Sequence, residues 1–231
     1  MAAGETLAPL IAVVGCDGSG KSTLSADILA HIRATRAAKS GYLGLGSGEQ
    51  GRAIGRWPII GARLQAFLEG QAARLRDADG TIPSTLAARY ALRRSLKRRA
   101  KFENLLAARR AGICVVTDRY PQTEVAGLHD GPILAARATN AAQAALKARE
   151  HALYAEMASY LPTLVIRLTI DVASVMARKP DHDEALIRRK VATVPLLHFG
   201  GAPMVTIDAT MDYSAERALA FAAVDAALAA G

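Results

Sequence analysis

Aromatic residues are scarce in this chain of 231 residues, which has four Phe, one Trp and six Tyr. Hydrophobic residues nevertheless make up 51% of the sequence, so most of the apolar surface comes from Ala, Leu, Ile and Val. A chain of this length buries roughly 70% of the surface that its unfolded form exposes, and it needs no covalent cross-links to fold. A core of aliphatic residues favours helices packed on a buried parallel sheet.

Cysteines and long apolar runs are also few. Cys16 and Cys114 lie far apart in the sequence, and neither belongs to a CxxC pair. This argues against a disulfide framework and a zinc site, and it points to a reducing, cytoplasmic compartment. Residues 1–9 hold no Lys or Arg ahead of the apolar run, which argues against a signal peptide. No apolar stretch reaches the ~18 residues that span a bilayer, so no membrane is expected as a partner.

The charge is unbalanced toward cations, with 29 Lys and Arg against 21 Asp and Glu and a formal net charge of +8. Such an excess is typical of proteins that bind polyanions, which include both nucleic acids and small polyphosphates. Much of the excess is arginine in segments of helical pattern, where a solvated helix face is the ordinary interpretation. Nucleic acid is therefore not the expected partner.

Short apolar runs alternate with longer segments of helical periodicity. This alternation predicts an α/β fold, in which a doubly wound sheet of five parallel strands carries helices on both faces, as one domain over residues 1–231. The strands are expected at Leu10–Val14, Tyr42–Leu45, Ile113–Thr117, Leu164–Ile170 and Pro203–Ile207. The helices are expected at Ser22–Arg36, Ile59–Arg76, Ser84–Arg110 with Ser84 as N-cap, Thr139–Tyr160, a short segment from Asp171, and Ser214–Ala229.

The segment between the first strand and the first helix carries a phosphate-binding motif, GxxxxGK followed by Ser or Thr. Its glycines let backbone N–H groups approach phosphate oxygens, and the helix N-terminus adds positive potential. Lys21 is expected to reach the β- and γ-phosphates of ATP, and the Ser22 hydroxyl is expected to ligate Mg²⁺. The cofactor-binding residues are thus Gly15, Asp17, Gly18, Ser19, Gly20, Lys21, Ser22 and Thr23.

A second acidic position follows the apolar run Ile113–Thr117. Asp118 ends this run, and the end of a buried parallel strand lies beside the phosphate loop in such a sheet. A carboxylate placed there can hold Mg²⁺ directly or through water. The alternative for Asp118 is an ordinary turn or helix cap.

Together, residues 17–23 and the triplet Asp118-Arg119-Tyr120 resemble thymidylate kinases and their relatives. The resemblance implies a P-loop kinase fold with a small lid over residues 178–190, and it allows a homodimer. It also implies that Asp17 contacts the sugar of the acceptor, that Arg119 contacts the transferring or acceptor phosphate, and that Tyr120 lies at the acceptor site. Within the lid, Arg178 is expected to act on the transferring phosphoryl group, although ion pairs on an exposed helix are the alternative for these charges.

The acceptor is less well defined by the sequence. The stretch Gly44–Arg52 differs from the Phe/Arg/Pro-containing motif that thymidylate kinases carry after the second strand, and Arg52 is the candidate substitute. Glu49 resembles the general base of deoxynucleoside kinases, which transfer to a hydroxyl group, but a solvated loop acid is the simpler interpretation. On the long basic helix, Arg93 and Arg94 are the candidates for substrate contact, and a solvated face is expected for most of the other cations.

These observations predict an ATP- and Mg²⁺-dependent phosphotransferase. Lys21, Asp118, Arg119 and Arg178 are the expected catalytic residues, and Ser22 with Asp118 the expected metal ligands. The first acceptor to consider is a nucleoside monophosphate, dTMP foremost, and the second is a hydroxyl group on a nucleoside, sugar or glycan intermediate. A nucleotide-dependent switch or polyanion-binding ATPase remains the alternative from another class.

Overall fold

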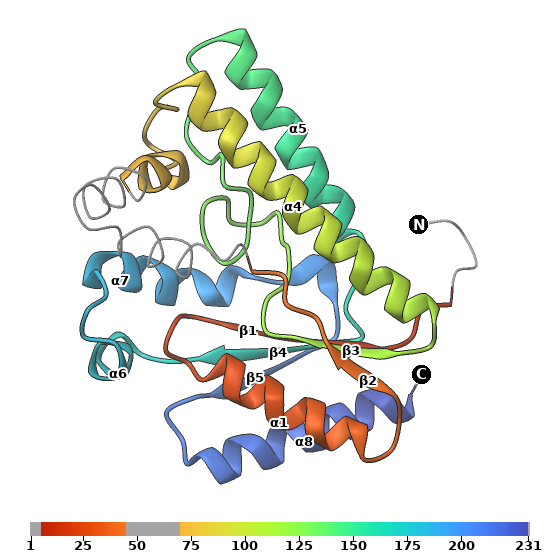
Figure 1. Cartoon of the computed structure of the whole chain (residues 1–231). Coiled ribbons are helices and arrows are strands. Elements are labelled where there is room, and N and C mark those ends of the chain that lie inside the picture. The colour runs from red at the N-terminus through yellow and green to blue at the C-terminus, as the bar shows by residue number, and fades with distance from the viewer. Residues whose placement is uncertain (1–5, 45–69, 231) are drawn as a thin grey trace, which may run out of the picture.

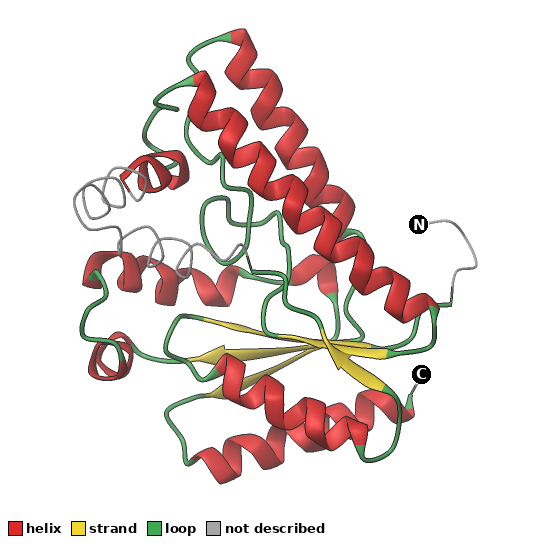
Figure 2. Ribbon diagram, in the orientation of Figure 1, coloured by secondary structure: helices red, strands yellow, loops and turns green. Residues whose placement is uncertain are grey.

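The computed structural model describes residues 6–44 and 70–230 of the chain. They form an all-parallel sheet of five strands in the order β2-β3-β1-β4-β5, with helices on both faces (Figures 1 and 2). The strands are β1 (Leu10–Gly15), β2 (Ala38–Ser40), β3 (Cys114–Thr117), β4 (Leu164–Thr169) and β5 (Met204–Asp208). The predicted α/β fold with five parallel strands is confirmed.

The helices follow the strands in alternation. They are α1 (Lys21–Arg33), α4 (Thr85–Arg110), α5 (Ala141–Ala158), α6 (Val172–Arg178), α7 (Glu184–Thr193) and α8 (Tyr213–Ala229). Residues 70–76 are also helical, and 3-10 turns occur at Val194–Leu196 and Phe199–Gly201. No described helix is both long and apolar enough to cross a membrane.

Alternation along the central strand divides the core into two layers. Ile11 and Val13 of β1 point into the cluster that packs against α1 and α8, whereas Leu10, Ala12 and Val14 point into the cluster that includes α4 and α5. All five side chains are buried, as expected for a strand with neighbours on both sides and helices above and below. Figure 1 shows α1 and α8 covering one face while α4 and α5 lie side by side over the other.

Two predicted elements do not match the described elements in full. The second strand was expected at Tyr42–Leu45, and the structure places it at Ala38–Ser40 instead. This strand lies at the edge of the sheet, where its side chains stay partly exposed and an apolar run is not required. Of the helix expected at Ile59–Arg76, only residues 70–76 lie within the described part of the chain, and they are helical.

The order of strands in the sheet changes direction at β1, because β2 and β3 lie on one side of β1 and β4 and β5 lie on the other. The β1–β2 connection passes through α1 on one face, whereas α4 precedes β3 on the opposite face (Figure 1). Ligands of doubly wound sheets bind at such a point, outside the carboxyl ends of the strands. The ends of β1 and β3 are therefore where a functional site is expected.

Candidate functional site

The phosphate loop between β1 and α1 has a backbone that only glycine allows at two positions. A Cβ atom on Gly15 would lie 2.6 Å from the carbonyl oxygen of Leu168 in β4. Gly20, the N-cap of α1, has a φ of 85°, in the left-handed region that favours glycine. The backbone conformation of the loop therefore requires glycine at these two positions, in agreement with the sequence motif.

The N-terminus of α1 differs from those of the other long helices. The helices α4, α5, α6, α7 and α8 each follow a Ser, Asn or Asp whose side chain accepts a hydrogen bond from the first-turn backbone. Gly20 offers no such side chain, so no side-chain cap satisfies the first N–H groups of α1. Free N–H groups at a helix N-terminus, with the helix dipole behind them, suit a phosphate.

Lys21 is held inside the loop rather than in solvent. Its side chain is buried, and its ammonium group donates a hydrogen bond of 2.5 Å to the carbonyl oxygen of Cys16. Burial lowers the pKa of Lys21 below its usual value, the carboxylate of Asp17 opposes this effect, and the guanidinium of Arg119 adds to it. A bound polyanion would favour the charged form of this lysine.

Ser22 of α1 and Asp118 lie in contact beside the phosphate loop. The Ser22 hydroxyl donates a hydrogen bond of 3.0 Å to Oδ2 of Asp118, which follows β3. A hydroxyl and a carboxylate are hard oxygen donors, which is the ligand chemistry that Mg²⁺ prefers. The described residues contain no cluster of three or more His, Cys, Asp or Glu that would hold a metal by themselves, so phosphate oxygens and water would complete the shell.

Asp17 of the phosphate loop forms an ion pair with Lys190 of α7. Burial alone would raise the pKa of Asp17, but Lys190, with Lys21 and Arg119, outweighs burial and holds that pKa well below the usual range. His129 contacts the same turn of α7, with Nε2 lying 2.8 Å from the Lys190 carbonyl oxygen and 2.9 Å from the Thr193 hydroxyl. These contacts attach the helix within the expected lid to the phosphate loop and to the loop after β3.

Arg119 and a buried arginine share one carboxylate. Arg98 of α4 donates to Oδ1 of Asp130 over 2.6 Å, while Nη1 of Arg119 lies 3.4 Å from Oδ2. Arg98 also donates to the carbonyl oxygens of Leu43 (2.9 Å) and Asp130 (2.8 Å). Burial would raise the pKa of Asp130, but Arg98 and then Arg119 lower it, so the net shift is downward.

Several of these groups line one cleft at the carboxyl ends of β1 and β3. Its wall consists of Val14, Gly15, Lys21, Asp118, Arg119, Tyr120, His129, Asp130, Leu197 and Phe199. Three of the expected catalytic residues, Lys21, Asp118 and Arg119, are thus brought together. His129, Asp130 and Arg98 were missed by sequence reasoning, because no motif surrounds them and the basic helix suggested solvated cations.

The remaining predicted residues lie in different places. Tyr120 lines the same cleft but is almost fully buried, and its hydroxyl donates to the Tyr160 carbonyl while its ring contacts Phe102. Arg178 donates to the carbonyl oxygens of Gly18 (3.0 Å) and Ala209 (2.8 Å), between the phosphate loop and the end of β5. Glu49 and Arg52 lie outside the described residues.

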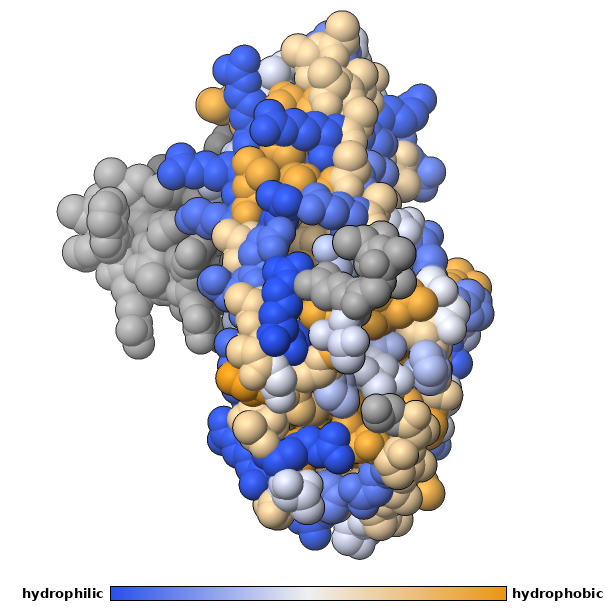
Figure 3. Space-filling model, turned by 90° about the vertical axis from the view of Figure 1, so that its right-hand side faces the viewer, coloured by the Kyte–Doolittle hydropathy of each residue, from blue (hydrophilic) through white to orange (hydrophobic). Residues whose placement is uncertain are grey.

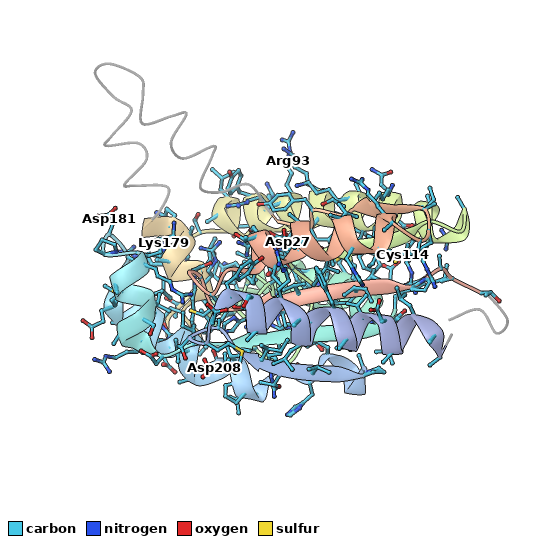
Figure 4. The ribbon with its side chains drawn as sticks, turned by 90° about the horizontal axis from the view of Figure 1, so that it is seen from below. Asp27, Arg93, Cys114, Lys179, Asp181 and Asp208 are labelled. Carbon is cyan, nitrogen blue, oxygen red and sulfur yellow. The ribbon has the colours of Figure 1, made fainter. Side chains whose placement is uncertain are left out.

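The cations of the basic helix α4 differ in how exposed they are. Arg93 is exposed, and Figure 4 shows it projecting away from the molecule, whereas Arg94 is partly buried. Hydrophilic and hydrophobic residues lie side by side over the upper part of the surface in Figure 3. A solvated face was predicted for most of these cations, and Arg98 and Arg109 are exceptions, since they are only 3% and 5% exposed.

Comparison with known proteins reveals close relatives. The chain is 42% identical over 201 residues to the uncharacterized ATP-binding protein YghS of Escherichia coli (strain K12), in an alignment that covers 86% of this chain and 85% of YghS. It is 39% identical over 207 residues to the uncharacterized ATP-binding protein YghR of the same strain, with 89% of this chain and 82% of YghR covered. No family model matches the sequence. At these identities and coverages, the chain belongs to the family of the Escherichia coli ATP-binding proteins YghS and YghR.

Proposed function

We propose that this protein binds ATP with Mg²⁺ and transfers the γ-phosphoryl group to a small acceptor, as an enzyme that resembles thymidylate kinases. The observation that carries the proposal is the convergence of Lys21, Asp118 and Arg119 in one cleft. Ser22, at the uncapped N-terminus of α1, donates a hydrogen bond to the same Asp118. The naming of YghS and YghR as ATP-binding proteins supports the nucleotide part of the proposal.

Each group has a role that follows from its chemistry. The N–H groups of the phosphate loop and the Lys21 ammonium would bind the phosphate chain of ATP. Ser22 and Asp118 would hold Mg²⁺, which supplies charge neutralisation at the β- and γ-phosphate oxygens when it is bound. Arg119 lines the cleft beside them, and its planar guanidinium suits phosphate oxygens that carry the developing charge. Catalysis of this kind consists of positioning and charge stabilisation.

Phosphate acceptors fit the site better than hydroxyl acceptors do. A phosphate is already anionic and needs no general base, whereas a hydroxyl group gains from one. Asp17 is a weak base because Lys190 keeps its pKa well below the usual range. A nucleoside monophosphate, with dTMP first among them, is therefore the proposed acceptor, and Arg119 would contact its phosphate.

A hydroxyl acceptor remains the second candidate because of His129. Its Nε2 faces the Lys190 carbonyl oxygen, which can only accept, so this nitrogen carries the proton. Burial lowers the pKa of His129, which leaves the other ring nitrogen free of a proton near neutral pH. A neutral imidazole in the same cleft as Lys21 is the kind of group that accepts a hydroxyl proton.

The proposal is tested by measuring ADP release from ATP–Mg²⁺ with a panel of nucleoside monophosphates, nucleosides and sugars. Turnover with dTMP or another monophosphate supports the first candidate, and turnover with hydroxyl acceptors alone supports the second. Hydrolysis that nucleic acid stimulates, without transfer to any small acceptor, would instead identify a polyanion-dependent ATPase. Turnover that persists unchanged in Lys21→Ala would contradict all of these assignments.

A further inference from the structure

The loop between β3 and α5 places two residues in the cleft with an unusual backbone. His129 and Asp130 have φ values of 45° and 64°, in the left-handed region that residues other than glycine rarely adopt. Backbone of this kind is strained and persists only where surrounding contacts impose it. Such positions cluster at functional sites, so the contacts that impose this conformation need an explanation.

Two buried polar side chains hold the loop in this shape. Gln122 Nε2 donates to the carbonyl oxygens of Val125 (2.8 Å), Leu128 (2.9 Å) and His129 (3.3 Å), and its Oε1 accepts from the Val125 N–H. Glu150 of α5 is fully buried and accepts from the N–H groups of Ile133 (3.2 Å) and Leu134 (2.7 Å). Asp130 lies between these two anchors, so its position is fixed from both sides.

The two arginines bound to Asp130 are not equally satisfied. Arg98 is almost fully buried, and short bonds to a carboxylate and two carbonyl oxygens use all three of its nitrogens. Arg119 is one-third exposed and reaches Asp130 only through Nη1, at 3.4 and 3.5 Å. Its Nε has no hydrogen-bond partner among the described residues. No nitrogen of Arg98 is thus left for another acceptor, whereas Arg119 can still donate to an anion that enters the cleft.

We propose that Asp130 is a positioning residue that orients the guanidinium of Arg119 toward the phosphoryl group in transfer. This inference rests on the proposed function. Asp130 binds Nη1 of the guanidinium, which leaves the other nitrogens of the group for phosphate oxygens. Arg98 neutralises most of the Asp130 charge, so the cleft that also holds Lys21 stays attractive to anions. The loop after β3 therefore acts as a rigid support for the transferring group rather than as a surface turn.

The test measures the affinity of the protein for ADP–Mg²⁺ with and without beryllium fluoride, which mimics a transferring phosphoryl group beside ADP. The wild-type protein is expected to bind ADP–Mg²⁺ more tightly when beryllium fluoride is present. Asp130→Asn keeps the size of the side chain but removes its charge, and it is expected to reduce this gain about tenfold, since hydrogen bonds between charged groups contribute on that scale. Affinity for ADP–Mg²⁺ alone is measured in the same titrations, so that the gain is a ratio within each variant.

A double-mutant cycle separates positioning from a general structural effect. If Asp130 acts through Arg119, then Asp130→Asn has no further effect on the gain in a protein that already carries Arg119→Gln. Additive losses of gain would overturn the inference, and so would a full gain in Asp130→Asn. A wild-type protein that binds ADP–Mg²⁺ but shows no gain would also overturn it, whereas a failure to bind ADP–Mg²⁺ would overturn the proposed function itself.

Two further variants are controls for misfolding. Asp130→Asn weakens the pair with buried Arg98 and is expected to lower the melting temperature, so Asp130→Glu, which keeps the charge, should be measured in parallel and show a smaller loss of gain. Glu156→Gln is the matched control, because Glu156 pairs with the neighbouring Arg99 on the exposed side of α4, at 2.7 Å. This control should show the gain of the wild-type protein.

Discussion

Two loops form the cleft, and they differ in the groups that they present to it. The phosphate loop after β1 presents backbone N–H groups, and its glycines make that presentation possible. The loop after β3 presents side chains, and partners from α4 and α5 fix its shape. A backbone site has to be encoded in consecutive residues, whereas a side-chain site can be assembled from residues that are far apart in the sequence. The comparison predicts that changes in the first loop act mainly on nucleotide binding and that changes in the second act on stability and on the transfer step.

The largest expected effect on nucleotide binding is in the phosphate loop. Lys21→Ala should weaken the binding of ATP–Mg²⁺ by about a hundredfold, because it removes a charged donor to two phosphate groups. Equilibrium titration with a fluorescent ATP analogue measures this loss. Lys97→Ala, which removes an exposed lysine of α4, is the matched control and should bind as the wild-type protein does. Similar affinity in Lys21→Ala would break the assignment of the loop.

The second loop should respond in stability rather than in nucleotide binding. Glu150→Ala removes the acceptor of Ser95 Oγ and of two backbone N–H groups in a fully buried place. We expect the free energy of unfolding to fall by about 3 kcal/mol, because unsatisfied buried donors cost about 1–3 kcal/mol each. Urea unfolding measures this loss, and Glu156→Ala on the exposed face of the same helix should cost less than about 1 kcal/mol. A small loss in Glu150→Ala would show that the loop does not depend on its buried anchor.

The pair that joins the phosphate loop to α7 gives a pH-dependent effect. The pKa of Asp17 is lower in the folded protein than its usual value, so its contribution to stability is complete above that usual value, near 3.9, and is lost as the pH falls through the folded pKa. Asp17→Asn should therefore be less stable than the wild-type protein by about 1 kcal/mol at pH 7, and the difference should shrink below about pH 4. Thermal unfolding from pH 7 to pH 3 measures this change. A difference that stays constant over that range would contradict the ion pair with Lys190.

The smallest effect is expected on the exposed side of α4. Arg99→Ala breaks the exposed pair with Glu156 and should change the free energy of unfolding by no more than about 0.5 kcal/mol, with less effect at high salt. The neighbouring Arg98→Ala removes a buried cation and leaves Asp130 without its shortest bond, so a loss of about 3–5 kcal/mol is expected. Equal losses in the two variants, measured by urea unfolding, would show that burial does not separate these two arginines.

Sequence alone was sufficient for the parts of the molecule that depend on local pattern. Buried strands such as Leu10–Gly15 are apolar along their length, and Ser84 caps α4 as predicted. The phosphate loop was found because its geometry demands glycine at fixed spacing. The position of Asp118 beside the phosphate loop, where it accepts from Ser22, followed from the rule that the ends of parallel strands meet at one edge of a sheet.

The rest required the structure for physical reasons. The edge strand Ala38–Ser40 is polar because one of its sides lacks a neighbour, so the apolar run at Tyr42 was a misleading signal. Arg98 and Arg99 are identical in type and adjacent in sequence, and only the fold decides that one is buried against Asp130 and the other exposed. Asp130 itself lies in a loop whose conformation depends on Gln122 and Glu150, which no local pattern connects to it.

The central claim, phosphoryl transfer from ATP, is tested most directly by incubating the protein with ATP labelled in the γ-phosphoryl group, Mg²⁺ and the acceptor panel, and then locating the label. The account predicts that the label appears on an acceptor, with dTMP or another nucleoside monophosphate first, and that Lys21→Ala abolishes this transfer. Label that stays in ATP, or that appears only in inorganic phosphate with every acceptor tested, would contradict the account.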